Sequence, residues 1–157
     1  IRVMAANPIV FVCANPIPEI WPWEAHAAGA RIIATGRGDF PNQLNNSLSF
    51  PGIFRGVLDV RASAITDQMA IAAARELAAF AKEKGLKDER ILPTMDDWEV
   101  FPRVAAAVAA EAQQAGLAIE LSPEEVRAQA EVTIRRARDT VATLMHEGLI
   151  ITEPDEA

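Results

Sequence analysis

Residues 35–62 read TGRGDFPNQLNNSLSFPGIFRGVLDVRA, a stretch in which glycines, prolines and carboxamides are denser than core packing requires. A short apolar run at 30–34, with two adjacent isoleucines, precedes it and is typical of a β-strand. Gly36 and Gly38 then permit a tight turn close to a ligand. The polar cluster is therefore expected at the end of a strand, where it forms either a binding site or a capped, asparagine-rich surface turn.

The carboxamides of this stretch are its most unusual feature. Asp39 is suited to cap a helix, and Pro41 or Pro51 to its first turn. The pattern predicts a helix there, with the carboxamides on two neighbouring faces. Each offers donors and an acceptor without a charge, which suits a ligand that mixes hydroxyl, carboxylate and amide groups. These residues are Asn42, Gln43, Asn45 and Asn46.

A second strand is predicted upstream, at 9–14, where a continuous apolar run lies between prolines. Such a run is typical of a strand buried on both faces, as in a parallel sheet. Asn15 follows the run directly and therefore falls at the carboxyl end of the strand, where open α/β sheets bind ligands. The alternative is a turn-forming asparagine.

A helix at 18–28 completes a β-α-β unit, with Gly29 as the residue that ends it. Trp21 and Trp23 are expected to cover the sheet or a subunit interface. His26 is expected to be solvated, because no second histidine or carboxylate stands at metal-ligand spacing.

Composition narrows the class of ligand. The 157 residues carry a formal net charge of −7, with no basic run, which argues against nucleic acid as the main partner. Cys13 is the only cysteine and lies in an apolar run, so we predict inert core packing and a reducing, cytoplasmic setting. No apolar segment is long enough to span a bilayer, and a soluble protein with a small-molecule ligand is expected. The absence of tyrosine and the initial Ile1 suggest a piece of a longer protein.

Beyond the opening stretch the pattern is helical. Helices are predicted at 63–84, from Pro102 to about 115, and from the capping box at 122–125 onward. Asp96 and Asp97 are expected in a solvated loop, and residues 149–157 as an apolar anchor followed by an acidic tail. We expect an α/β fold: a partial Rossmann-like domain with a doubly wound parallel sheet at 1–116, then a helical carboxyl-terminal extension at 117–157.

No G-x-G-x-x-G turn, Walker loop or nucleophile elbow occurs in the chain. The segments VFVCANPIPEI and ATGRGDFPNQLNNSLSFPGIFRGVLDVRA instead resemble the carboxyl-terminal part of the NAD(P)-binding domain of bacterial and archaeal malic enzymes. The resemblance covers about residues 8–116 and departs from the family pattern at the flanking positions Ile17 and Gly38. It implies oxidative decarboxylation of malate to pyruvate and carbon dioxide.

The resemblance also implies roles for particular residues. Asn15, in the A-N-P-x-P-E motif, is expected to reach the substrate and the nicotinamide. Asn45 and Asn46, in P-N-Q-x-N-N, are expected to face malate and the nicotinamide ribose, and the Gly36 backbone to approach the cofactor. Arg37 and Arg55 attract the anionic ligand or, as the simpler alternative, pair with Asp39 and Asp59.

The family's tyrosine and lysine for acid–base chemistry, and its acidic ligands for Mg²⁺ or Mn²⁺, belong to sequence that this chain does not contain. We therefore expect the isolated chain to be inactive, with NAD or NADP as the cofactor of the longer protein and a homo-oligomer, dimer or larger, as its assembly. Two alternatives stay open: a non-enzymatic nucleotide-binding or assembly domain, and another hydroxy-acid or amino-acid dehydrogenase.

Overall fold

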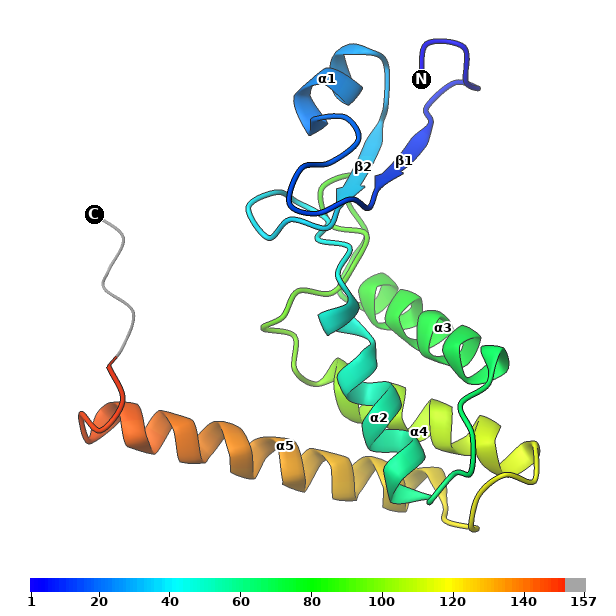
Figure 1. Ribbon diagram of the computed structural model, residues 1–157, viewed down its shortest axis with the longest axis vertical. Helices are drawn as coiled ribbons and strands as arrows, with labels where there is room; N and C mark the ends of the chain where they lie inside the picture. Colours follow the sequence, from blue (N-terminus) through cyan, green and yellow to red (C-terminus); the bar gives the residue numbers. More distant parts are fainter. Residues whose placement is uncertain (152–157) are drawn as a thin grey trace.

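The computed structural model describes residues 1–151 and shows an α/β fold with a small strand-containing lobe and a larger helical lobe (Figure 1). Strands β1 (Ile9–Val12) and β2 (Ile32–Thr35) are parallel, with Ile9 opposite Ile32 and Val12 opposite Thr35. Helix α1 (Pro22–Ala27) connects them and confirms the predicted β-α-β unit, although it is shorter than expected. A small core of four buried residues joins the helix to the strands: Val12, Ala25, Ala30 and Ile33.

Strand β1 is less buried than the sequence predicts. The side chains of Ile9 and Phe11 are each more than half exposed, whereas Val12 is buried. Successive side chains of a strand point to opposite faces, so only one face of β1 packs against the small core. The strand also ends at Val12, which leaves Cys13 in the following loop. The prediction that Cys13 packs in the core is therefore wrong, and its side chain is exposed.

The chain does not form the predicted helix directly after β2. Residues 36–45 form an irregular loop in which Asn42 adopts a left-handed conformation at φ 56°. A 3₁₀ turn, η1 (Asn46–Leu48), and helix α2 (Phe50–Asp59) follow it. Asn45, rather than Asp39, caps this turn, because its side chain accepts a hydrogen bond from the Ser47 N–H. The carboxamides consequently lie in a loop and not on the faces of a helix.

Four helices form the second lobe and its core. They are α2, α3 (Asp67–Glu83), α4 (Val100–Gln114) and α5 (Pro123–His146). Helix α4 lies between the others (Figure 1). It contributes half of the buried residues of this core, more than any other helix. Helix α2 approaches it closely because Gly52 and Gly56 are buried on the contacting side. The residues of this core that are fully buried include Val60, Met69, Val100, Val104, Val108 and Val126.

The first residues of α3 and α5 are set by capping side chains just before each helix. Thr66 caps α3, so this helix begins four residues later than predicted, and Ile65 precedes it. The predicted capping box at Ser122 is confirmed at the start of α5. The first turns of α5 bury Val126 and Ala130 against the helical core, while its later turns project away from the lobe (Figure 1).

The predicted acidic tail at 152–157 lies outside the described residues. The division of the chain at residue 116 stays a prediction. None of the helices within residues 1–151 has the length and apolar character needed to cross a membrane.

The segment between α3 and α4 returns to the strands and ties the two lobes together (Figure 1). The Asn42 amide donates hydrogen bonds to the backbone oxygens of Ile33 (3.1 Å) and Asp88 (2.8 Å). Its oxygen accepts from the Ile91 N–H at 2.8 Å. Arg31 forms a two-fold hydrogen-bonded ion pair with the Asp88 carboxylate. Asn42 is buried, and its carboxamide forms hydrogen bonds within the protein rather than facing a ligand.

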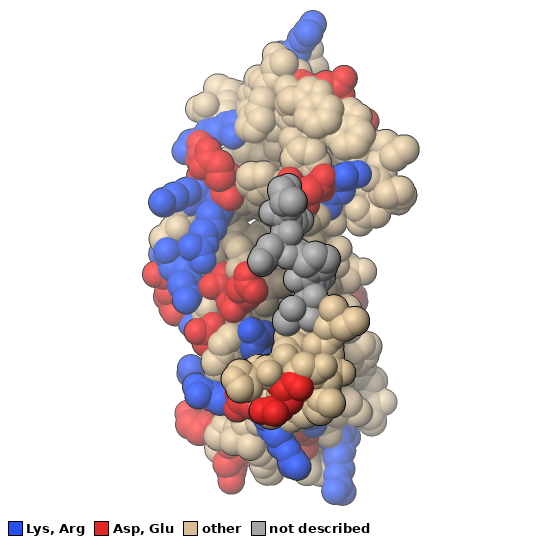
Figure 2. Space-filling view, turned by 90° about the vertical axis from the view of Figure 1, so that its left-hand side faces the viewer, with Lys and Arg blue, Asp and Glu red and all other residues tan. Residues whose placement is uncertain are grey.

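Charges of both signs are interspersed on the face of the molecule that Figure 2 shows, over both lobes. Several charged side chains of the protein are paired, as in Arg31 with Asp88 and Arg103 with Glu83. The expectation that nucleic acid is not the main partner rests on the acidic net charge and stays a prediction.

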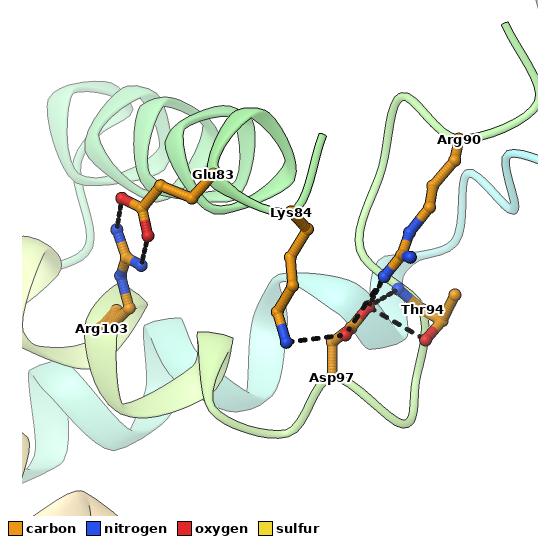
Figure 3. Close-up of polar contacts among 6 residues, drawn as sticks. All are labelled: Glu83, Lys84, Arg90, Thr94, Asp97 and Arg103. Atoms are coloured by element: carbon orange, nitrogen blue, oxygen red, sulfur yellow. Dashed lines mark hydrogen bonds and ion pairs between the residues drawn. The ribbon is translucent and has the colours of Figure 1, made fainter. Parts of the chain in front are cut away.

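Asp97 departs from the predicted solvated loop, because it is buried where α3, the connecting segment and α4 meet (Figure 3). Its carboxylate accepts hydrogen bonds from the Thr94 N–H (2.8 Å) and hydroxyl (3.1 Å). Arg90 and Lys84 approach the same carboxylate at 3.3 and 3.7 Å. Burial raises the pKa of Asp97, but the Thr94 hydrogen bonds and the two positive charges outweigh it and hold the pKa below its usual value.

We expect Asp97→Ala to lower the free energy of unfolding by about 2 kcal/mol at pH 7, because hydrogen bonds to a buried charged group are lost. A carboxyl whose folded-state pKa is lowered stabilises the fold above its unfolded pKa of about 4, and this contribution disappears as the pH falls through the lowered value. Urea unfolding at pH 7 and pH 3 measures both effects. Asp96→Ala is the matched control, because Asp96 is exposed. Equal losses for the two variants at pH 7 would contradict the assigned role.

Candidate functional site at the carboxyl edge of the strands

The loops that follow β1 and β2 meet at the carboxyl edge of the parallel pair. Residues 13–18 leave β1 through a cis Asn15–Pro16 bond, and residues 36–45 leave β2. The carboxyl ends of adjacent parallel strands lie at one edge of a sheet, so the geometry expected for Asn15 and the asparagine-rich stretch is the one observed.

Asn15 lies directly on the backbone of Gly36. A Cβ atom at Gly36 would stand 2.4 Å from Asn15 Nδ2, closer than real Cβ atoms approach a neighbour, and 3.0 Å from its Cγ. Gly36 is itself buried, whereas Asn15 is an exposed residue. Glycine at 36 therefore makes room for a carboxamide that stays accessible to a ligand.

Asn45 is tied to the same peptide. Its Nδ2 donates to the Gly36 backbone oxygen at 3.3 Å, and its Oδ1 accepts from the Ser47 N–H at 3.0 Å. These two contacts fix which end of the amide faces which neighbour. The Asn45 amide keeps its second N–H and the second lone pair of its oxygen for a ligand. Asn15, Gly36 and Asn45 are thus brought together.

Asn46 is next along the chain and exposed. Its backbone oxygen accepts from the Ser49 N–H at 3.0 Å and from the Ser49 hydroxyl at 3.2 Å. Within residues 1–151, no hydrogen bond joins its side chain to Asn15, Gly36 or Asn45. Asn46 therefore borders the cluster, and its carboxamide is open to solvent.

Arg37 makes a contact that the sequence does not reveal. Its Nε and Nη2 donate to the Asp39 carboxylate at 2.8 and 2.7 Å, which confirms the predicted ion pair, and the hydrogen bonds from Arg37 lower the pKa of Asp39. Its Nη1 also donates to the Pro16 backbone oxygen at 2.8 Å, across 21 residues of sequence. The pairing of Arg55 with Asp59 is confirmed as well.

Aromatic side chains flank this edge. Trp21 and Trp23 stack in nearly parallel planes with ring centroids 4.9 Å apart, and Phe40 lies 6.3 and 6.0 Å from them. The Arg37 guanidinium stands over the Trp21 ring at 5.4 Å. Trp23 is more than half exposed. His26 is exposed as predicted, and its ring Nδ1 lies 3.0 Å from the Ala30 backbone oxygen.

The residues described do not fit a divalent-cation site. In the part of the chain that the structure describes, no three His, Cys, Asp or Glu side chains are grouped so that they could hold a metal ion. Mg²⁺ and Mn²⁺ prefer clustered oxygen ligands, of which carboxylates are the usual charged ones. The groups that meet at Gly36 are neutral amides and backbone atoms, which carry no formal charge.

Parallel strands joined by a helix, with carboxamides at the carboxyl edge, define part of a Rossmann-like nucleotide-binding domain. The family model described as "Malic enzyme, NAD binding domain" matches residues 2–113. The chain belongs to this family.

Individual relatives agree with the family match. The chain is 50% identical over 127 residues to the bifunctional malic/malolactic enzyme of Bacillus subtilis, covering 80% of this chain and 31% of the relative. It is 42% identical over 160 residues to an NADP-dependent malic enzyme of Rhizobium meliloti, covering 92% and 21%. The crystal structure of Entamoeba histolytica malic enzyme superposes with a TM-score of 0.95 at 50% identity, covering 98% of this chain and 32% of that chain. The chain thus spans about a third or less of these proteins.

Proposed function

We propose that this chain is the carboxyl-terminal part of the NAD(P)-binding domain of an enzyme that oxidises malate and releases pyruvate and carbon dioxide. One observation carries the proposal: the amides of Asn15 and Asn45 converge on Gly36 at the carboxyl edge of β1 and β2. This is the edge at which open α/β sheets bind their ligands. Membership of the malic enzyme family then selects malate and NAD(P) among the ligands that such an edge could take.

The amides are suited to a dicarboxylic substrate. Malate carries two carboxylates and a hydroxyl, and neutral amides bind these groups without adding negative charge beside them. In the proposed complex, Asn15 contacts malate and the nicotinamide, while Asn45 and Asn46 contact malate and the nicotinamide ribose. When bound, NAD(P)⁺ supplies the hydride acceptor. These residues hold the substrate and the cofactor in the orientation that hydride transfer requires.

The remaining chemistry is assigned to the rest of the polypeptide. An acid–base pair and a carboxylate-bound Mg²⁺ or Mn²⁺ are expected there, since the residues described do not fit a cation site. The isolated chain is therefore expected to be inactive. NAD and NADP stay equally open, because the residue that reads the ribose 2′ position lies outside this half-domain.

We also propose a cytoplasmic homo-oligomer, dimer or larger. The exposed ring of Trp23 and the exposed α2 side chains Phe50, Phe54 and Leu58 support an assembly, because large apolar groups on a surface favour contact with another protein surface. The single exposed Cys13 agrees with a reducing compartment.

The test uses the longest polypeptide that contains this chain, with malate, Mn²⁺ and either NAD⁺ or NADP⁺. The proposal predicts reduced cofactor and pyruvate in equal amounts, and no turnover by the 157-residue chain alone. Reduced cofactor without loss of carbon dioxide would instead indicate another hydroxy-acid dehydrogenase. Turnover by the isolated chain would contradict the assignment of the acid–base pair to the rest of the protein.

A further inference from the structure

We propose that Arg37 is a positioning residue: by holding the Pro16 backbone oxygen, it keeps the Asn15 carboxamide against Gly36. The inference rests on the proposed function, because it concerns the same site. Pro16 follows Asn15 directly, so a displacement of the Pro16 peptide moves the Asn15 backbone with it. The hydrogen bond from Arg37 Nη1 to this oxygen is 2.8 Å long and links the loop after β2 to the loop after β1.

The loop that carries Asn15 has few other restraints. Within the described residues, two side-chain hydrogen bonds reach the backbone of 13–18: Arg37 to the Pro16 oxygen, and the Ala14 N–H to Glu19 Oε2 at 3.2 Å. The first lies immediately after Asn15 and the second immediately before it. Loss of the Arg37 contact therefore releases the loop on one side of Asn15.

Arg37 is itself held rigidly. Both oxygens of Asp39 accept from it, and its guanidinium lies 5.4 Å from the centroid of Trp21 and 5.8 Å from that of Phe40. A guanidinium fork fixed by a two-point carboxylate contact and an aromatic face is a defined anchor for a third bond. Asp39 already neutralises the charge of Arg37. Arg37 therefore holds the loop in place, a role that we call the clamp, and is not free to bind an anion.

The clamp affects the reaction because Asn15 must be positioned correctly against both malate and the nicotinamide. A reacting group displaced by about 1 Å can lower the rate of an oriented reaction about 100-fold. The expected effect of losing Arg37 therefore falls on kcat more than on the apparent affinity for malate or the cofactor.

A double-mutant cycle in the longest polypeptide tests whether Arg37 acts through Asn15. We expect Arg37→Ala to lower kcat between about 10- and 100-fold, with a smaller change in KM, and Arg37→Lys to restore part of the loss. If Arg37 works through Asn15, the Arg37→Ala/Asn15→Ala double variant is no slower than Asn15→Ala alone. Multiplication of the two single effects would overturn the proposal.

The matched control is Arg135→Ala. Arg135 pairs with Glu131 at 2.8 Å and lies 4.9 Å from the Trp98 centroid, so it repeats the carboxylate and aromatic contacts of Arg37 on α5. It is expected to leave kcat within about twofold of the parent. A loss equal to that of Arg37→Ala would overturn the positioning role, since both would then reflect general stability.

Cys13 provides a readout that does not depend on activity. It is exposed and lies in the same loop, two residues before Asn15. Alkylation of the folded protein without ligands, followed at the Cys13 peptide by mass spectrometry, is expected to be several-fold faster in Arg37→Ala than in the parent and in Arg135→Ala. An unchanged rate would overturn the clamp. If the parent protein fails to oxidise malate, the proposed function fails, and a raised labelling rate would still support the hold of Arg37 on the loop.

Discussion

Replacing Gly36 with alanine is expected to lower kcat/KM for malate about 100-fold while changing the free energy of unfolding by less than about 1 kcal/mol. The added methyl group would stand 2.4 Å from Asn15 Nδ2, so the carboxamide must move. Because Asn15 is an exposed residue, its carboxamide can turn away from Gly36 toward solvent, which relieves the clash at little cost in stability. When the Asn15 carboxamide moves, it loses the orientation that we propose for ligand binding.

Gly38→Ala is the matched control for this prediction. Gly38 lies in the same loop, and a Cβ there would meet the end of the Gln43 side chain at 3.1 Å, which can shift by a few tenths of an ångström. We expect this variant to keep kcat/KM within about threefold of the parent, because it leaves Asn15 in place. Steady-state kinetics of both variants measure kcat/KM, and urea unfolding measures their free energies of unfolding. Equal activity in Gly36→Ala and Gly38→Ala would show that the Asn15 position does not matter.

The second large effect is expected in the helical core, where Gly56→Ala should lower the free energy of unfolding by about 2–3 kcal/mol. A Cβ at Gly56 would stand 2.5 Å from the Ala105 backbone oxygen and 3.1 Å from Val108 Cβ. The backbone of α4 cannot rotate away as a surface side chain can. Helices α2 and α4 must therefore move apart. The effect opposes intrinsic helix propensity, which favours alanine by about 1 kcal/mol.

Arg75→Ala controls for the Gly56 variant. Arg75 is exposed on α3, and arginine and alanine have similar helix propensities. We expect its unfolding free energy to stay within about 0.5 kcal/mol of the parent in urea titrations of the 157-residue chain. A stable Gly56→Ala variant would contradict the close α2–α4 packing that positions the loop before α2.

The strands and their carboxyl edge could be predicted from the sequence because the signals are local. The apolar runs before Asn15 and Gly36 indicate strands, and a helix-length connection between them requires parallel pairing. Parallel pairing then brings both strand ends to one edge, which places Asn15 beside Gly36. The capping box of α5 is similarly local and was predictable for the same reason.

The contacts that shape the site in detail are long-range and left no local signal. Asn42 bonds to Asp88 and Ile91, 46 and 49 residues away, and its left-handed backbone replaces the helix that the prolines and Asp39 predict. The ion pairs of Asp97 likewise need the folded chain, which brings Lys84 at the end of α3 and Arg90 in the connecting segment to one carboxylate. Arg37 shows both cases: its bond to Asp39 follows from spacing, but its bond to Pro16 requires the folded edge.

In the proposed complex, the amides of Asn15 and Asn45 orient malate and the nicotinamide. This role is tested by the rate of malate-dependent NAD(P)⁺ reduction, with pyruvate quantified, in the longest polypeptide and in its Asn15→Ala and Asn45→Ala variants. Gln68→Ala serves as the control, because it removes an exposed carboxamide from α3. The proposal predicts losses of about 100-fold in the two asparagine variants and none in the control. Full activity in both asparagine variants would contradict it.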